Sequence, residues 1–199
     1  MRDESWERAV RSFEIEAECI KKSPEFIDKN DFGMAVAALK KAGRIAASGC
    51  GHSGIACMHF AHSMCCINLP ARFISPSEAV HGALGFLKRG DVMVLASRGG
   101  KTAELLPVLK ICKDKGVTVI GVSENEKSPL AGDSDIFIKM FVERESDRYD
   151  SQGTSSFVVL CAVFDALQVA LIEETCFKNE DFAINHPGGA VGERLARRK

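Results

Sequence analysis

The sequence lacks an excess of charge of either sign, because 26 Lys and Arg residues are matched by 27 Asp and Glu residues. It has no basic block that would indicate nucleic-acid binding and no acidic tail that would indicate disorder. Its first ten residues are charged and lack the apolar segment of a signal peptide. The longest apolar run, residues 157–172, contains Asp165 and Gln168 and is too short to span a membrane. These absences predict a cytoplasmic protein that binds neither nucleic acid nor membrane.

The eight cysteines lack the CxxC spacing that is typical of metal and redox sites. Cys57, Cys112 and Cys161 stand among apolar neighbours, and the adjacent pair Cys65 and Cys66 has poor geometry for a mutual disulfide. We therefore expect eight reduced thiols, as in cytosolic proteins.

Short apolar segments of strand type alternate with helical patterns along the chain. The predicted strands are residues 44–48, 71–74, 92–96, 117–122 and 136–138. The predicted helices are residues 4–27, 31–41, 53–68, 77–84, 102–115, 128–131, 154–176 and 190–198, with irregular segments at 143–153 and 179–189. Thr154 is the expected cap of the long apolar helix. The alternation predicts a doubly wound five-stranded parallel sheet with helices on both faces in three α/β/α layers. The flavodoxin-like order 2-1-3-4-5 is the strand order that we expect for it.

The strand at residues 92–96 runs into the turn SRGG at 97–100 and then into a helical pattern. The first N–H groups of a helix have no internal partner and carry partial positive charge, so they attract anions. Glycine lets the backbone approach the anion, and Ser97 and Thr102 add hydroxyl groups. The stretch indicates a phosphate site, although an ordinary strand-to-helix turn fits it equally well. It is no P-loop, because Leu95 stands where that motif needs glycine.

A second glycine-rich turn, GCGHSG at residues 49–54, also lies between a strand and a helix. It fits GxGxxG, the dinucleotide fingerprint. A dinucleotide site needs an acidic residue at the end of the next strand to hold the ribose, but residues 75–77 are Ser-Pro-Ser and Glu78 comes only after them. Nucleotide binding is therefore disfavoured. In the order 2-1-3-4-5 the two turns lie side by side at the switch point, where ligands bind in such sheets.

Histidines and carboxylates near these turns are candidate acids and bases. His186 precedes Pro-Gly-Gly on a non-helical segment, which suits a positioned catalytic group as well as a simple turn. Glu104 lies at the mouth of the phosphate turn, and Glu143 and Glu145 lie in the polar segment before the long helix. With histidine they could move protons next to a carbonyl. A helix-dipole carboxylate and solvated charges are the alternatives.

Three motifs carry a resemblance to a known family: GxGxSG at residues 49–54, EAxHGxLG at 78–85 and FAxNHPGGAxGxRL at 182–195. Together they resemble the SIS (sugar isomerase) domain family, and most closely its arabinose 5-phosphate isomerase branch, over residues 43–195. The resemblance implies one SIS domain over residues 1–199, with leading helices at 1–42 and an α/β core and C-terminal arm at 43–199. Longer members continue into CBS domains, which this chain would lack. A homo-oligomer, commonly a tetramer, with shared active sites is also implied.

The resemblance assigns site residues by position. The branch's catalytic positions fall on Glu104, Glu145 and His186, and its catalytic lysine is replaced by His52. His81 is a further group that could help to open the sugar ring. The substrate phosphate is expected at Ser53, Ser97, Gly99, Gly100 and Thr102.

The implied activity is an aldose–ketose isomerisation of a phosphorylated sugar through an enediol. Glu145 is the expected base, and Glu104 is expected to position hydroxyl groups. Such chemistry requires no metal or other cofactor. A non-catalytic sugar-phosphate binding or sensing module is the alternative, because His52 departs from the pattern of the branch.

Overall fold

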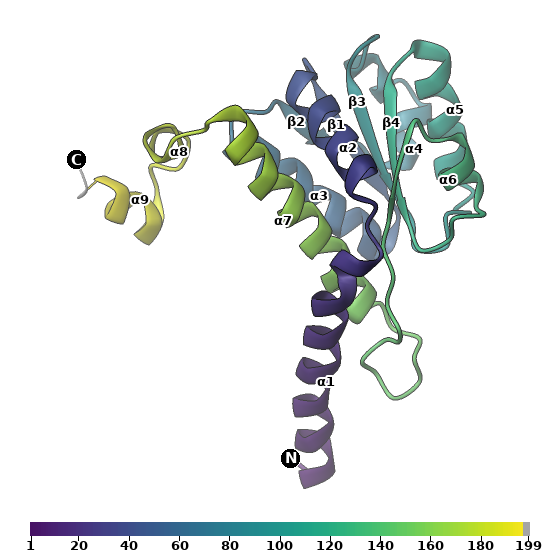
Figure 1. Ribbon diagram of the computed structural model, residues 1–199, viewed down its shortest axis with the longest axis vertical. Coiled ribbons are helices and arrows are strands. Elements are labelled where there is room, and N and C mark those ends of the chain that lie inside the picture. The colour runs from purple at the N-terminus through teal and green to yellow at the C-terminus, as the bar shows by residue number, and fades with distance from the viewer. Residues whose placement is uncertain (197–199) are drawn as a thin grey trace.

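A parallel sheet forms the centre of the chain in the computed structural model, which describes residues 1–196. Within these residues the sheet has five strands in the order β2-β1-β3-β4-β5 (Figure 1). The strands are β1 (Ile45–Gly49), β2 (Ala71–Phe73), β3 (Val92–Ala96), β4 (Thr118–Ser123) and β5 (Ile136–Lys139). All four pairings are parallel, so the fold class and the strand order expected from the sequence are confirmed.

Helices cover both faces of this sheet. On one face lie α1 (Asp3–Lys22), α2 (Lys29–Lys41), α3 (Gly51–Cys66) and α7 (Ser155–Thr175). On the other face lie α4 (Pro76–Val80), the 3-10 turn η2 (Ala83–Phe86), α5 (Leu105–Lys115) and α6 (Pro129–Asp133). A 3-10 turn η1 (Ser23–Glu25) follows α1, and α8 (Asn179–Asn185) and α9 (Gly189–Ala196) form the C-terminal arm.

Alternation along the strands divides the core into two apolar clusters. In β3, Val92 and Val94 face the cluster beneath α3 and α7, whereas Met93 and Leu95 face the cluster beneath α5. All four side chains are buried, because both faces of a doubly wound sheet are covered. Continuous apolar strands therefore fix a rigid sheet whose carboxyl edge can present loops.

Helix α7 is long and apolar enough to cross a membrane by length and composition alone. The expectation that this run is too short to span therefore fails on length, since the helix has 21 residues. Its apolar character has another cause. Val159, Val163 and Leu167 are buried in the core cluster, and Gln168 donates from Nε2 to the carbonyl of Ser63 at 3.1 Å. The helix packs along α3 as part of the core.

Several element boundaries differ from those expected. The first helix ends at Lys22 rather than at residue 27, because Pro24 follows and the chain tightens into η1. The helix expected at 77–84 is two pieces, since Gly82 has a φ of 108°, outside the helical region. Residues 179–185 were expected to be irregular but form α8, where Asp181 accepts from the backbone N–H of Lys178 at 3.3 Å. The last predicted helix begins as expected, and its predicted end at Arg198 lies outside the described residues.

All eight cysteines lie in the described part of the chain and are free thiols. Cys19, Cys57 and Cys112 belong to the buried core. Burial raises the pKa of the Cys57 thiol, and it raises the pKa of Cys112 to about 12. Both thiols therefore stay protonated at neutral pH and act as small apolar groups in packing.

Two glycines provide a matched test of the turn that precedes α3. A Cβ on Gly54 would lie 2.7 Å from the carbonyl oxygen of Gly49, whereas a Cβ on Gly33 in α2 would meet nothing within 4 Å. We expect Gly54→Ala to lower the free energy of unfolding by about 1–3 kcal/mol through overpacking. Gly33→Ala should raise it by about 0.5–1 kcal/mol, because alanine favours a helix. Urea unfolding followed by circular dichroism measures both, and equal stabilities would contradict the close approach.

Candidate active site

The two glycine-rich turns lie next to each other at the carboxyl edge of the sheet. Gly49, the last residue of β1, pairs in register with Ala96, the last residue of β3. The first turn starts α3, and the backbone N–H of Gly54 donates to the carbonyl of Cys50 at 3.2 Å. The second turn leads through residues 97–104 into α5. The strand order reverses between β1 and β3, so both turns open into the crevice where doubly wound sheets bind ligands.

The second turn is held by its own hydroxyl groups. Ser97 Oγ and Thr102 Oγ1 are 2.8 Å apart, and the backbone N–H of Gly100 donates to Ser97 Oγ at 3.1 Å. Gly100 has a φ of 65°, and a Cβ there would collide with the hydroxyl group of Ser128. Glycine is therefore required at position 100 for conformation and for space. The turn is a compact loop with both hydroxyl groups on its inner side.

The loop also contains backbone N–H groups without hydrogen-bond acceptors in the described part of the chain. Among the hydrogen bonds of residues 1–196, none uses the N–H groups of Lys101, Thr102 or Ala103 as donors. These groups precede α5, whose dipole places partial positive charge at this end. With the hydroxyl groups of Ser97 and Thr102 they are a local set of donors of the kind that suits a phosphate group.

Glu104 stands at the exit of this loop, immediately before α5, and is exposed. It faces the first turn. Burial, and then the negative charge of Glu104, raise the pKa of the Cys50 thiol. An exposed carboxylate between the two turns is free to exchange a proton with a bound molecule.

Glu145 has a different environment. Its side chain is fully buried and accepts five hydrogen bonds. Two come from the backbone N–H groups of Thr154 and Ser156 at 2.9 and 3.0 Å, and two come from the hydroxyl groups of the same residues. The fifth comes from Arg98 Nη1 at 2.5 Å. Both carboxylate oxygens are thus occupied by donors from the first turn of α7 and from the phosphate loop.

This arrangement corrects the expected cap of α7. Thr154 makes no side-chain capping bond to its own helix. Its hydroxyl group instead donates to Glu145 and accepts from the backbone N–H of Ser146 at 2.8 Å. The capping acceptor is the carboxylate of Glu145, nine residues earlier in the chain, because a negative charge satisfies the orphan N–H groups and the helix dipole together.

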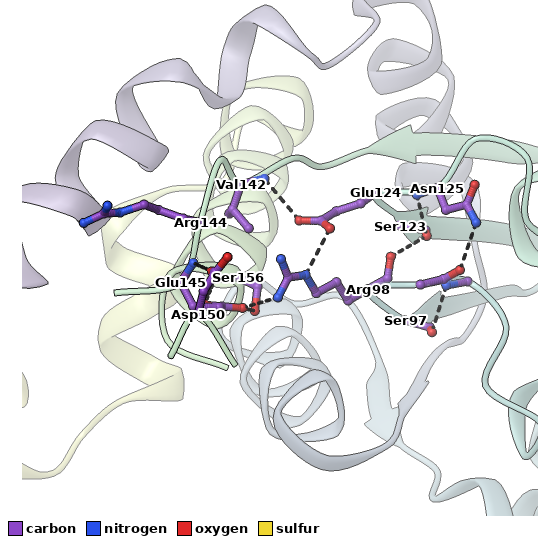
Figure 2. Close-up of polar contacts among 12 residues, drawn as sticks. Ser97, Arg98, Ser123, Glu124, Asn125, Val142, Arg144, Glu145, Asp150 and Ser156 are labelled. Atoms are coloured by element: carbon purple, nitrogen blue, oxygen red, sulfur yellow. Dashed lines mark hydrogen bonds and ion pairs between the residues drawn. The ribbon is translucent and has the colours of Figure 1, made fainter. Parts of the chain in front are cut away.

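Arg98 and Glu124 complete a polar network that the sequence did not single out as a site. Figure 2 shows the Arg98 side chain extending from the phosphate loop to the two carboxylates of Glu124 and Glu145. Partial burial would lower the pKa of the Arg98 guanidinium, but the hydrogen bond to Glu124 and the nearby carboxylates raise it. The sequence feature that could have indicated this network is Arg98 itself, a charged residue inside a glycine-rich turn and next to Ser97.

His52 lies in the first turn of α3, beside the start of α7. Its ring centroid is 5.7 Å from that of Phe157, and a Cβ on Gly153 would lie 2.8 Å from His52 Nδ1. His52, Ser53 and Arg98 line the same small cavity. The structure therefore brings His52 and Ser53 together with the phosphate loop, and glycine at position 153 leaves room for the imidazole.

The other two candidate histidines lie apart. His81 is exposed at the end of α4, on the crossover that leaves the carboxyl edge after β2. His186 follows α8 in the C-terminal arm, where its Nδ1 is buried without a hydrogen-bond partner in the described residues. The preceding Asn185 donates to Asn68 Oδ1 at 2.7 Å, just before β2 begins. The arm that carries His186 thus lies beyond the end of α7 at the amino edge, on the side opposite the phosphate loop of its own chain (Figure 1).

Replacing Glu145 tests whether its role is to hold the site together. We expect Glu145→Ala to lower the free energy of unfolding by about 2–3 kcal/mol, since it leaves α7 uncapped and Arg98 without its buried partner. Glu145→Gln should cost less, because an amide oxygen still accepts hydrogen bonds. Glu143→Ala is the matched control: this exposed neighbour makes only a surface pair with Lys22. Equal losses at positions 143 and 145 in denaturant titrations would refute the role of Glu145.

Comparison with known proteins agrees with the fold and with the motifs. The model of the SIS domain family matches residues 38–170. The arabinose 5-phosphate isomerase KdsD of Pseudomonas aeruginosa is 37% identical over 153 residues, which cover 77% of this chain and 47% of that protein. KdsD of Francisella tularensis is 31% identical, covering 94% of this chain and 58% of that protein. The chain thus spans about half the length of these curated relatives.

A solved structure of similar length extends this likeness. A putative sugar-phosphate isomerase from Listeria monocytogenes has a TM-score of 0.91 and 37% identity, covering 94% of this chain and 99% of that one. The family match extends over more than half of the chain and includes all five strands and both glycine-rich turns. The chain belongs to the SIS domain family.

Proposed function

We propose that this protein is a sugar-phosphate aldose–ketose isomerase, with arabinose 5-phosphate as the first substrate to test. The observation that carries the proposal is the loop at residues 97–104, where two hydroxyl groups, unpaired N–H groups and an exposed carboxylate meet at the carboxyl edge of β3. The curated relatives carry the name arabinose 5-phosphate isomerase. An Escherichia coli CFT073 protein of this fold, with 28% identity and a TM-score of 0.86, was solved in complex with arabinose 5-phosphate.

In this proposal the phosphate group binds inside the loop. Ser97 and Thr102 turn their hydroxyl groups from each other toward the phosphate oxygens, and the N–H groups before α5 supply further donors. Gly99 and Gly100 keep side chains out of the space that the phosphate needs, and Ser53 adds a hydroxyl group from the neighbouring turn. The loop then fixes one end of an open-chain sugar.

The sugar carbonyl and the adjacent carbon extend from the loop past Glu104. Isomerisation passes through an enediol: the hydroxyl proton of O2 is lost and O1 gains one, while the proton on C2 of the aldose is removed and a proton is returned to C1. We assign this transfer to Glu104, because its carboxylate is exposed beside both turns. Glu145 was the base expected from the sequence. In this proposal it serves as an anchor, because its two oxygens already accept five hydrogen bonds.

Histidines supply the remaining chemistry in this proposal. His52 lies closest to the phosphate loop and donates to a sugar oxygen, and His81 or His186 assists ring opening. His186 lies at the amino edge of its own chain, so we propose that it serves the site of a neighbouring subunit. The active form is then a cytoplasmic homo-oligomer, and a tetramer is the assembly we propose.

Turnover of arabinose 5-phosphate, measured as ketose formed, tests the proposal. The unmodified protein should form ribulose 5-phosphate, and Ser97→Ala should weaken phosphosugar binding by about 1–3 kcal/mol, because a charged acceptor loses a donor. Unphosphorylated arabinose should bind poorly to both. The matched control for Ser97→Ala is Ser5→Ala, because Ser5 lies on α1, far from the phosphate loop. Ser128 would be a poor control, because it lies behind the loop at Gly100. Binding of pentose and hexose phosphates without any turnover would favour a sensing module instead.

Mixing two inactive variants tests the shared site. We expect Glu104→Gln and His186→Ala to be inactive alone and to regain part of the activity when their subunits exchange, because some sites then combine two intact halves. Glu104→Gln is chosen because position 104 is exposed and the fold should survive its change. Exchange is verified with differently tagged chains. No recovery after verified exchange would show that His186 does not act across a subunit boundary.

A further inference from the structure

Arg98 connects three segments that lie far apart in the chain. Its Nε donates to Glu124 Oε2 at 3.0 Å, and its Nη1 donates to Glu145 Oε1 at 2.5 Å. The Arg98 side chain is 42% exposed, whereas those of Glu124 and Glu145 are 20% and 0% exposed. One guanidinium thus pairs with two carboxylates, one partly and one fully removed from water. Its planar fork of donors suits this task, which a single ammonium group could not perform in the same geometry.

The backbone of Arg98 is held as firmly as its side chain. The hydroxyl group of Ser123 donates to the Arg98 carbonyl at 2.9 Å, and the backbone N–H of Glu124 donates to it at 3.0 Å. The second oxygen of Glu124 accepts from the backbone N–H of Val142 at 3.1 Å. The loop after β3 is therefore tied to the end of β4 and to the chain that follows β5 (Figure 2).

The network continues from Glu145 to His52. The carboxylate of Glu145 that receives Arg98 also holds Thr154 and Ser156 at the start of α7. Gly153, one residue before Thr154, lies against the imidazole of His52. A movement of Glu145 would therefore move the segment that packs on His52. Arg98 stands at the other end of this path, one residue after Ser97 of the phosphate loop.

We propose that Arg98 is a positioning residue that keeps the phosphate loop in register with His52 and the start of α7. It acts through Glu124 and Glu145 and does not itself bind the sugar phosphate. This inference rests on the proposed isomerase function for its kinetic readout, but its structural claim concerns only the placement of His52 relative to the loop. A competing role, direct attraction of the phosphate group, would use the guanidinium as a ligand.

Three variants separate these roles: Arg98→Met, Arg98→Lys and the control Arg8→Met. The control removes an arginine that also pairs with a carboxylate, Glu4, but on the exposed surface of α1. Each full-length variant is checked by circular dichroism. Its kcat and KM are measured with arabinose 5-phosphate, its Kd for inorganic phosphate by calorimetry, and the imidazole signal of His52 by NMR, assigned with His52→Gln.

For Arg98→Met we expect kcat to fall about 30- to 100-fold, as for other small misplacements of reacting groups, with the Kd for inorganic phosphate changed less than about threefold. The His52 signal should move. Arg98→Lys should recover kcat only in part, because one ammonium group cannot serve both carboxylates. Arg8→Met should match the unmodified protein in every measurement.

Other results overturn the proposal. An unchanged kcat with a Kd for phosphate raised more than about tenfold, restored by Arg98→Lys, would make Arg98 a phosphate ligand. An unmoved His52 signal in folded Arg98→Met would remove the positioning role. If Arg98→Met does not fold, Glu124→Gln, which weakens one arm only, must move the His52 signal, or the proposal is refuted. If the unmodified protein turns over no sugar phosphate, the isomerase proposal fails, and the His52 signal alone decides the role of Arg98.

Discussion

A buried carboxylate holds the carboxyl edge of this molecule together. Removing an ionised group from water costs several kcal/mol unless hydrogen bonds and an opposite charge replace the lost hydration. Glu145 receives both, from the first turn of α7 and from Arg98. The consequence is mutual dependence. Glu145 accepts hydrogen bonds from the first turn of α7, and together with Glu124 it fixes the side chain of Arg98. The loop that includes Arg98 is the candidate phosphate site.

The direction of the chain through the sheet determines which edge each candidate residue lies at. Parallel strands place every following turn at the same edge, so the turns after β1 and β3 meet without any special contact. Helix α7 runs alongside α3, from the carboxyl edge near His52 to the amino edge near residue 67. The arm formed by α8 and α9 therefore begins at the amino edge, opposite the phosphate loop of the same chain. This placement is why the proposed isomerase site takes His186 from a neighbouring chain.

Local patterns predicted much of this from the sequence. Alternating apolar strands and helices are sufficient for the parallel, doubly wound sheet, and a strand followed by Gly-rich residues is sufficient for both turns, because these signals lie within a few neighbouring residues. Thr154 occupies the N-cap position of α7 as predicted, but the side chain that accepts from the first turn of the helix is Glu145. The Arg98 network was not foreseen either, because its members are 26 and 47 residues apart. Helix α8 was missed because none of its residues is buried and its periodicity is weak.

The two glutamates at this edge differ in the property that proton transfer requires. A base must gain and lose a proton within a catalytic cycle, so its lone pairs must be open to the substrate. Protonating Glu145 would break a hydrogen bond to α7 or to Arg98 and leave a buried donor unpaired. The exposed side chain of Glu104 makes no hydrogen bond or ion pair among the described contacts, so its oxygens are open to a substrate. The loop that would bind the phosphate ends at Glu104. In this proposal, the buried carboxylate of Glu145 therefore fixes the position of the loop that ends at the exposed carboxylate of Glu104.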